Sequence, residues 1–162
     1  MILKWIFLGS LIYFFLVFII PFLIFPGFLR SSGIKVTEKT KKLAKKLKAR
    51  NKEKTFKNVF DYTQKKYTKE KHKAISELNK HFYKNVEEVL DKKQYLPCHV
   101  QNHVLVNLLI ASGQFKKEDF KKRFTISRRF LCIHEYYLIQ VDKKIFKADP
   151  FCGKLKEISN QN

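Results

Sequence analysis

The chain begins with a long uncharged segment and continues as a mixed apolar and basic sequence. The run from Trp5 to Leu29 contains no charged residue. About 20 apolar residues suffice for a helix that crosses a bilayer, whereas the apolar part of a cleaved signal peptide has about 7–15. The length of the run, and its end at Pro26-Gly27 rather than at small residues, favour an uncleaved anchor over residues 1–30.

The charges on the two sides of this segment predict its orientation. Only the α-amino group and Lys4 precede it, whereas many lysines follow it. Because cytoplasmic loops carry the excess of Lys and Arg, we expect a single-pass membrane protein with its domain on the cytoplasmic side. The 3 cysteines agree with a reducing compartment, since an odd number without a C-x-x-C pair argues against a disulfide framework and against a zinc site built from thiols alone.

Residues 31–55 form a basic stalk with few apolar positions. Thr37 and Glu38 carry the signal of a helix start, and Leu43 and Leu47 lie one turn apart on the helix that would follow. Two interpretations stay open. The helix could lie on anionic lipid headgroups, at about 1 kcal/mol per basic residue near the membrane, or it could be a solvated spacer.

The net charge widens the list of partners. The chain carries 34 Lys+Arg against 14 Asp+Glu, a formal net charge of +20. Such a field attracts anionic lipid, acidic protein or nucleic acid. Nucleic acid ranks last, because no aromatic residue that could stack on a base interleaves with the lysine run from Lys39 to Lys54.

The apolar positions after residue 55 recur at helical spacing. They predict a helix that begins near residue 55, a second over roughly 70–91 and a third from Cys98 to Gly113. The third is apolar around most of its circumference, which is typical of a buried helix. Pro97 before it and Gly113 at its end are the expected punctuation. Cys98 therefore lies in the first turn of a buried helix.

After a charged connection at 114–122, with one helical turn near its end, the period of the pattern changes from 3.6 to 2. The run FLCIHEYYLIQV at 130–141 reads as a strand, with His134 among the residues of one face. A turn at 142–144 leads into an antiparallel strand that Asp149 closes before Pro150. A short edge strand is expected after it.

Cys98, His134 and Asp149 have the order and the context of a thiol-nucleophile site. A helix N-terminus favours the thiolate form of a cysteine, and its N–H groups can stabilise an oxyanion. His134 and Asp149 fall on adjacent strands and on one face, so we expect a cross-strand or diagonal pair. A nucleophile needs such a base, and the base needs a group that orients it. Each residue taken alone is more often structural.

This arrangement resembles the transglutaminase-like superfamily of papain-like cysteine enzymes. In that family a Cys opens a buried helix, a His begins a strand with an aromatic residue two positions later, and an Asp closes the next strand, commonly as Asp-Pro. Here the spacings are 36 and 15 residues, and Tyr136 follows the His. The resemblance implies that Cys98 is the nucleophile, His134 the general base and acid, and Asp149 the orienting carboxylate.

The expected fold is accordingly α+β. We expect a papain/transglutaminase-like domain over residues 56–162, with helices packed on a small antiparallel sheet and preceded by one transmembrane helix. Two residues depart from the family pattern, Pro97 before the Cys and Glu135 after the His, where small residues are usual. The pattern identifies no single oxyanion side chain before Cys98, and Gln94 and Tyr95 are the two candidates. A further residue, Cys132, shares the strand face of the His and is either its resting partner or core.

The resemblance implies acyl transfer through a thioester at Cys98, on a protein or peptide substrate. Members of the superfamily hydrolyse peptide or amide bonds or cross-link glutamine to amines. The small size, without insertions for calcium, favours a hydrolase, and no cofactor or metal is expected. The alternative is a catalytically inactive module that acts as a membrane-tethered binding protein. A Cys98 sulfur more than about 5 Å from the His134 ring would favour that alternative.

Overall fold

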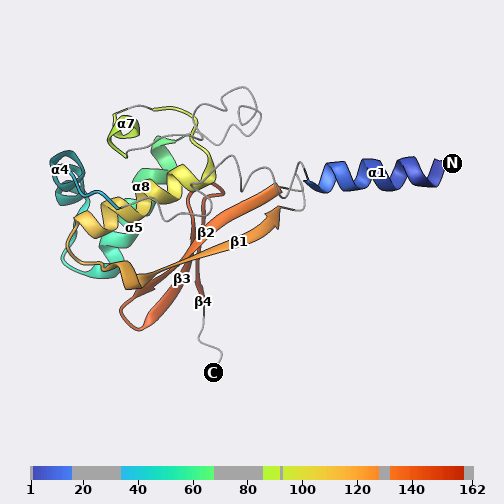
Figure 1. The fold of residues 1–162 in the computed structure, drawn as a ribbon. Coiled ribbons are helices and arrows are strands. Elements are labelled where there is room, and N and C mark those ends of the chain that lie inside the picture. Colours follow the sequence, from blue (N-terminus) through green and yellow to red (C-terminus); the bar gives the residue numbers. More distant parts are fainter. Residues whose placement is uncertain (1, 16–33, 68–85, 92, 128–131, 159–162) are drawn as a thin grey trace.

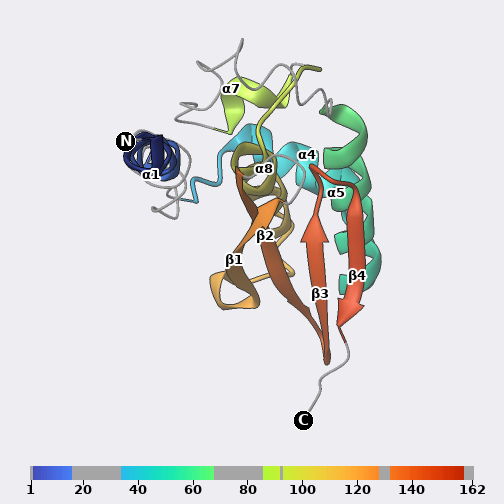
Figure 2. The ribbon, with the colours of Figure 1, turned by 90° about the vertical axis from the view of Figure 1, so that its right-hand side faces the viewer.

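The computed structural model describes residues 2–15, 34–67, 86–91, 93–127 and 132–158. In these ranges, helices between residues 38 and 111 lie on one side of an antiparallel sheet (Figures 1 and 2). The helices are α1 (Ile2–Phe14), α4 (Glu38–Leu47), α5 (Lys52–Lys66), α7 (Glu87–Leu90) and α8 (Cys98–Ala111), and a short 3₁₀ helix covers Lys117–Asp119. The strands are β1 (Phe120–Ser127), β2 (Cys132–Val141), β3 (Lys144–Asp149) and β4 (Lys154–Ile158).

The four strands form a meander in the order β1-β2-β3-β4, each antiparallel to the next. Asp142, with a left-handed backbone at φ 55, makes the turn between β2 and β3 that the sequence predicted. Side chains alternate between the two faces of β2 and β3, so one face is buried under the helices. The buried residues of that face are Glu135, Ile139, Val141, Phe146 and Ala148.

The helix α8 is the centre of the packed structure. It lies between α4 and α5 on one side and β2 on the other. Its residues Val104, Leu105, Leu108 and Leu109 are fully buried, as expected for a helix that is apolar around most of its circumference. The core continues into α5, where the ring of Phe56 packs on the ring of Phe146 of β3, with 5.3 Å between the ring centroids. This core holds the start of α8 against the β2–β3 hairpin.

The helix α4 lies inside the predicted basic stalk. Thr37 caps its N-terminus, as predicted, and its side-chain oxygen accepts a hydrogen bond from the Thr40 N–H at 3.3 Å. Thr40 and Ala44 are fully buried, and the helix packs against α8 and α5. The two buried positions, four residues apart, give α4 a face that joins the helical layer, so this helix is not a solvated spacer.

The prediction of a papain/transglutaminase-like domain preceded by one transmembrane helix is wrong. Within the described ranges, no helix is both long and apolar enough to cross a membrane. The described part of this region, α1, has 13 residues and so covers about 20 Å, against about 30 Å of hydrocarbon. The rest of the predicted anchor, 16–30, lies outside the described residues.

Two other sequence expectations have a mixed outcome. Most of the predicted helix over 70–91 lies outside the described residues, and α7 corresponds to its end. The predicted connection at 114–122 contains the expected helical turn, but it also contains the start of β1, a strand that the sequence did not predict. Lys121, Lys122 and Arg123 interrupt the apolar alternation that would predict a strand. The strand forms because its backbone pairs with β2.

Candidate functional site

Cys98 is the first residue of α8, and the residue is 8% exposed. Pro97 stands at the N-cap with extended backbone, and its carbonyl accepts hydrogen bonds from the N–H groups of Val100 (3.1 Å) and Gln101 (3.0 Å). Proline is well suited here because it has no N–H that would need a partner. The departure from the family pattern at Pro97 therefore leaves the thiol at the positive end of the helix dipole.

His134 on β2 and Asp149 at the end of β3 are hydrogen-bonded, with 2.7 Å between Nε2 and Oδ2. The strand register pairs Tyr137 with Ala148, so Asp149 lies one step beyond this pair and is the diagonal neighbour of His134 on the same face. Their side chains are 12% and 5% exposed. The structure thus brings together the two residues that the sequence paired.

The two groups stabilise each other's charge. Burial disfavours the charged imidazole, but hydrogen bonds with Asp149, Cys152 and Cys98 outweigh it and raise the pKa of His134 above its ordinary value of 6.5. Burial also disfavours the carboxylate, yet the hydrogen bond and the charge of His134 hold the pKa of Asp149 below its ordinary value of 3.8. At neutral pH the pair is an imidazolium and a carboxylate.

The Cys98 side chain also interacts with this pair. It is among the groups that raise the pKa of His134, both through a hydrogen bond and through its charge. Thus the start of α8 and the β2–β3 hairpin, which are far apart in the sequence, meet at one imidazole. A hydrogen bond joins His134 and Asp149, and Cys98 lies near enough to His134 to contribute to its raised pKa.

Cys152 is a member of the site that the sequence hypothesis missed. Its Sγ lies 3.7 Å from His134 Nε2, and its backbone N–H donates to Asp149 Oδ1 at 2.9 Å. A signal for it exists in the sequence, because an Asp before a Pro often starts a turn whose later N–H groups bond to the carboxylate. Cys132, the other cysteine considered, begins β2, and its side chain lies outside the described part of the structure.

Two aromatic rings pack beside the pair. Phe151 lies 5.9 Å from the His134 ring and 6.4 Å from the Tyr95 ring, measured between centroids. Phe151 is 9% exposed and Tyr95 is 3% exposed. The rings therefore keep water from the imidazole, which strengthens its hydrogen bonds. Of the two residues considered for an oxyanion role, Tyr95 thus packs against Phe151 and Gln94 is half-buried.

Glu135, the second departure from the family pattern, ties β2 to α8. Its carboxylate is 3.2 Å from Lys122 Nζ and 3.3 Å from Asn102 Nδ2, and the same amide also donates to the Glu135 carbonyl at 2.9 Å. Burial raises the pKa of Glu135 above its ordinary value, against the effect of Lys122. Asn102 lies one helical turn beyond Cys98, and Glu135 adjoins His134. This contact therefore fixes the thiol relative to the imidazole.

The hairpin residues also include the ligand types that a metal ion would use. His134, Asp149 and Cys152 offer one nitrogen, one carboxylate oxygen and one sulfur within 4.8 Å of one another. A tetrahedral zinc ion would separate nitrogen and oxygen ligands by about 3.3 Å. The 2.7 Å between Nε2 and Oδ2 is instead the length of a charge-assisted hydrogen bond. The geometry is that of an orienting pair, and a metal would first have to displace its shared proton.

Comparison with known proteins assigns no family to this site. No protein-family model, no curated protein and no solved structure matches the chain. What the protein does must therefore be inferred from Cys98, His134 and Asp149 themselves.

Proposed function

We propose that the protein is a cysteine enzyme that transfers or hydrolyses acyl groups, with Cys98 as the nucleophile, His134 as the general base and acid, and Asp149 as the group that orients His134. The observation that carries this proposal is the hydrogen bond between His134 and Asp149, close to the start of α8, where Cys98 contributes to the raised pKa of His134. Since Nε2 of the imidazole is held by Asp149, we assign Nδ1 to the reacting thiol.

The residues would act in two half-reactions. The Cys98 thiolate attacks a peptide or amide carbonyl carbon, and the electrons of the carbonyl bond move to its oxygen. The backbone N–H groups at the start of α8 face the charge that develops there. When the C–N bond breaks, the His134 imidazolium donates a proton to the leaving amine, and a thioester remains on Cys98. Neutral His134 then takes a proton from water, which attacks the thioester and releases the acid and the thiolate.

The same thioester could pass its acyl group to an amine instead of to water. The order of the three residues resembles the transglutaminase-like superfamily, in which both outcomes occur, and this resemblance stays a prediction. Water is the acceptor that we favour, because the small domain has no insertion for calcium. A protein or peptide substrate, and a cytoplasmic location of the domain, also stay predictions from the sequence.

An activated ester tests the proposal without knowledge of the natural substrate. The full chain in non-ionic detergent, mixed with p-nitrophenyl acetate, is expected to release about one equivalent of nitrophenol rapidly as Cys98 is acetylated. Hydroxylamine should then remove the acetyl group, since it cleaves thioesters. Peptide mass spectrometry locates the adduct. Acetylation at Cys152, or none at any cysteine, would contradict the proposal, and the second result would favour a catalytically inactive binding module.

A further inference from the structure

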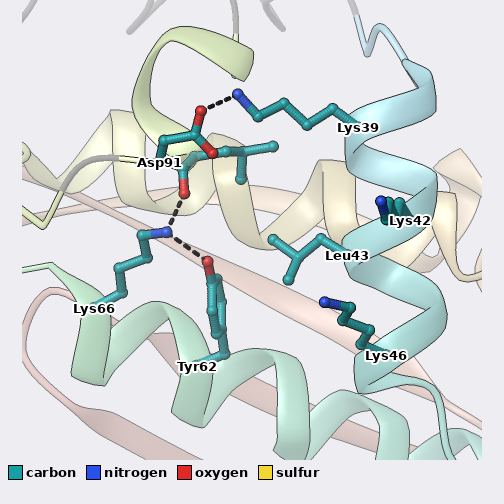
Figure 3. Close-up of a pocket in the computed structure, with 8 residues that line it drawn as sticks. Lys39, Lys42, Leu43, Lys46, Tyr62, Lys66 and Asp91 are labelled. Carbon is teal, nitrogen blue, oxygen red and sulfur yellow. Dashed lines mark hydrogen bonds and ion pairs between the residues drawn. The ribbon is translucent and has the colours of Figure 1, made fainter.

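One pocket of the structure shares no residue with the site around His134. It lies between α4, α5 and the end of α7 and has a volume of about 400 Å³, within the usual range of pockets that hold small molecules. In Figure 3, Leu43 and Lys46 of α4 face Tyr62 and Lys66 of α5 across this pocket. The residues that line it are Lys39, Lys42, Leu43, Lys46, Tyr62, Lys66, Leu90 and Asp91.

The pocket gathers four ammonium groups and one carboxylate. Lys39 forms an ion pair with Asp91, the single acidic residue in the lining (Figure 3). Lys66 donates to the carbonyl of Leu90 and to the Tyr62 hydroxyl at 2.7 Å, so oxygen atoms within the protein hold it in place. The pocket therefore has a fixed cation on its α5 side.

Lys42 and Lys46 supply the remaining charge. They lie four residues apart on α4, and both residues are exposed. Among the residues that the structure describes, neither has an acidic partner. Like charges gathered around one hollow repel each other, and an anion placed between them removes that repulsion. The arrangement thus favours an occupied pocket over an empty one.

We propose that this pocket binds a phosphate-bearing ligand. Several lysine ammonium groups suit the multiple charged oxygens of a phosphate, because each binds as a compact positive charge without a fixed geometry. The phosphate lies among Lys42, Lys46 and Lys66, and Leu43, Leu90 and the Tyr62 ring contact the carbon part of the ligand. A soluble phosphate ester and a phospholipid headgroup share this chemistry.

Paired variants of equal charge test the proposal. The full chain is titrated in non-ionic detergent with glycerol 3-phosphate, and separately, after removal of the detergent, with phosphatidylcholine vesicles that contain phosphatidic acid. The variant Lys42→Gln/Lys46→Gln removes two cations of the pocket. Its matched control, Lys41→Gln/Lys45→Gln, removes two exposed cations of the same helix that are not in the lining. Circular dichroism checks that both variants fold.

We expect the pocket variant to lose about tenfold or more in affinity, and the control less than about twofold. Asp91→Asn removes the competing carboxylate and should tighten binding. Saturation by glycerol 3-phosphate identifies a soluble ester, and binding to the vesicles alone identifies a lipid headgroup. Equal losses in the two double variants, or no saturable binding by the unmodified chain to either probe, would overturn the proposal.

Discussion

Replacing Cys98 by alanine is expected to abolish the labelling of the protein by limiting iodoacetamide. The thiol stands at the first position of α8, at the positive end of the helix dipole, and it contributes to the raised pKa of His134. A reactive cysteine of this kind outcompetes a structural one at low reagent concentration. Intact-mass spectrometry after a short reaction measures the labelled fraction.

Cys132→Ala and Cys152→Ala are the controls for this experiment. Cys152 is the sharper one, because its sulfur lies 3.7 Å from the same imidazole but away from a helix start. Both variants should keep most of the labelling. Equal labelling of all three cysteines, or a loss in Cys152→Ala instead of Cys98→Ala, would remove Cys98 from the role of nucleophile.

Asp149→Asn is expected to reduce turnover of an ester or amide by about 10³–10⁴-fold. The asparagine amide can still touch His134, but it cannot stabilise the imidazolium or select the same tautomer. Asp142→Asn is the matched control. It makes the same chemical change in an exposed turn with a left-handed backbone, which asparagine also tolerates. A variant of Asp149 with nearly full activity would show that no orienting carboxylate is needed.

The same substitution has a pH-dependent effect on stability. The lowered pKa of Asp149 gives a contribution that is present above 3.8 and is lost as the pH falls through the lower folded value. The raised pKa of His134 gives a contribution that is full below 6.5 and is lost as the pH rises through the higher folded value. Urea unfolding should therefore show the largest difference between wild type and variant, about 1–3 kcal/mol, between pH 4 and 6.5.

The sequence is most informative where one pattern decides the structure. Apolar residues that recur at helical spacing between Pro97 and Gly113 predict a buried helix, and α8 begins at the expected residue, Cys98. Strict alternation places His134 and Asp149 on one face of a hairpin, and the structure joins them. Both results follow from local periodicity, which tertiary contacts do not alter here.

The sequence is least informative where contacts between distant segments decide. The hydrogen bonds that join Asn102 to Glu135 span 33 positions, so the carboxylate after the histidine looks out of place until α8 is packed on β2. In the lysine-rich stretch of α4, only Thr40 and Ala44 are buried, and two small residues give too weak a pattern to predict that this helix packs in the helical layer. Cys152 reaches His134 only through the turn after Asp149.

The pairing of Cys98 with His134 is the central claim, and a histidine titration by NMR tests it most directly. The full chain, labelled with ¹⁵N in its histidines, is titrated in detergent as wild type, Cys98→Ala and Cys152→Ala, and His134→Gln identifies the resonance. Because the Cys98 hydrogen bond and charge contribute to the raised pKa of His134, the midpoint of His134 should fall in Cys98→Ala. An unchanged midpoint in Cys98→Ala would contradict the account.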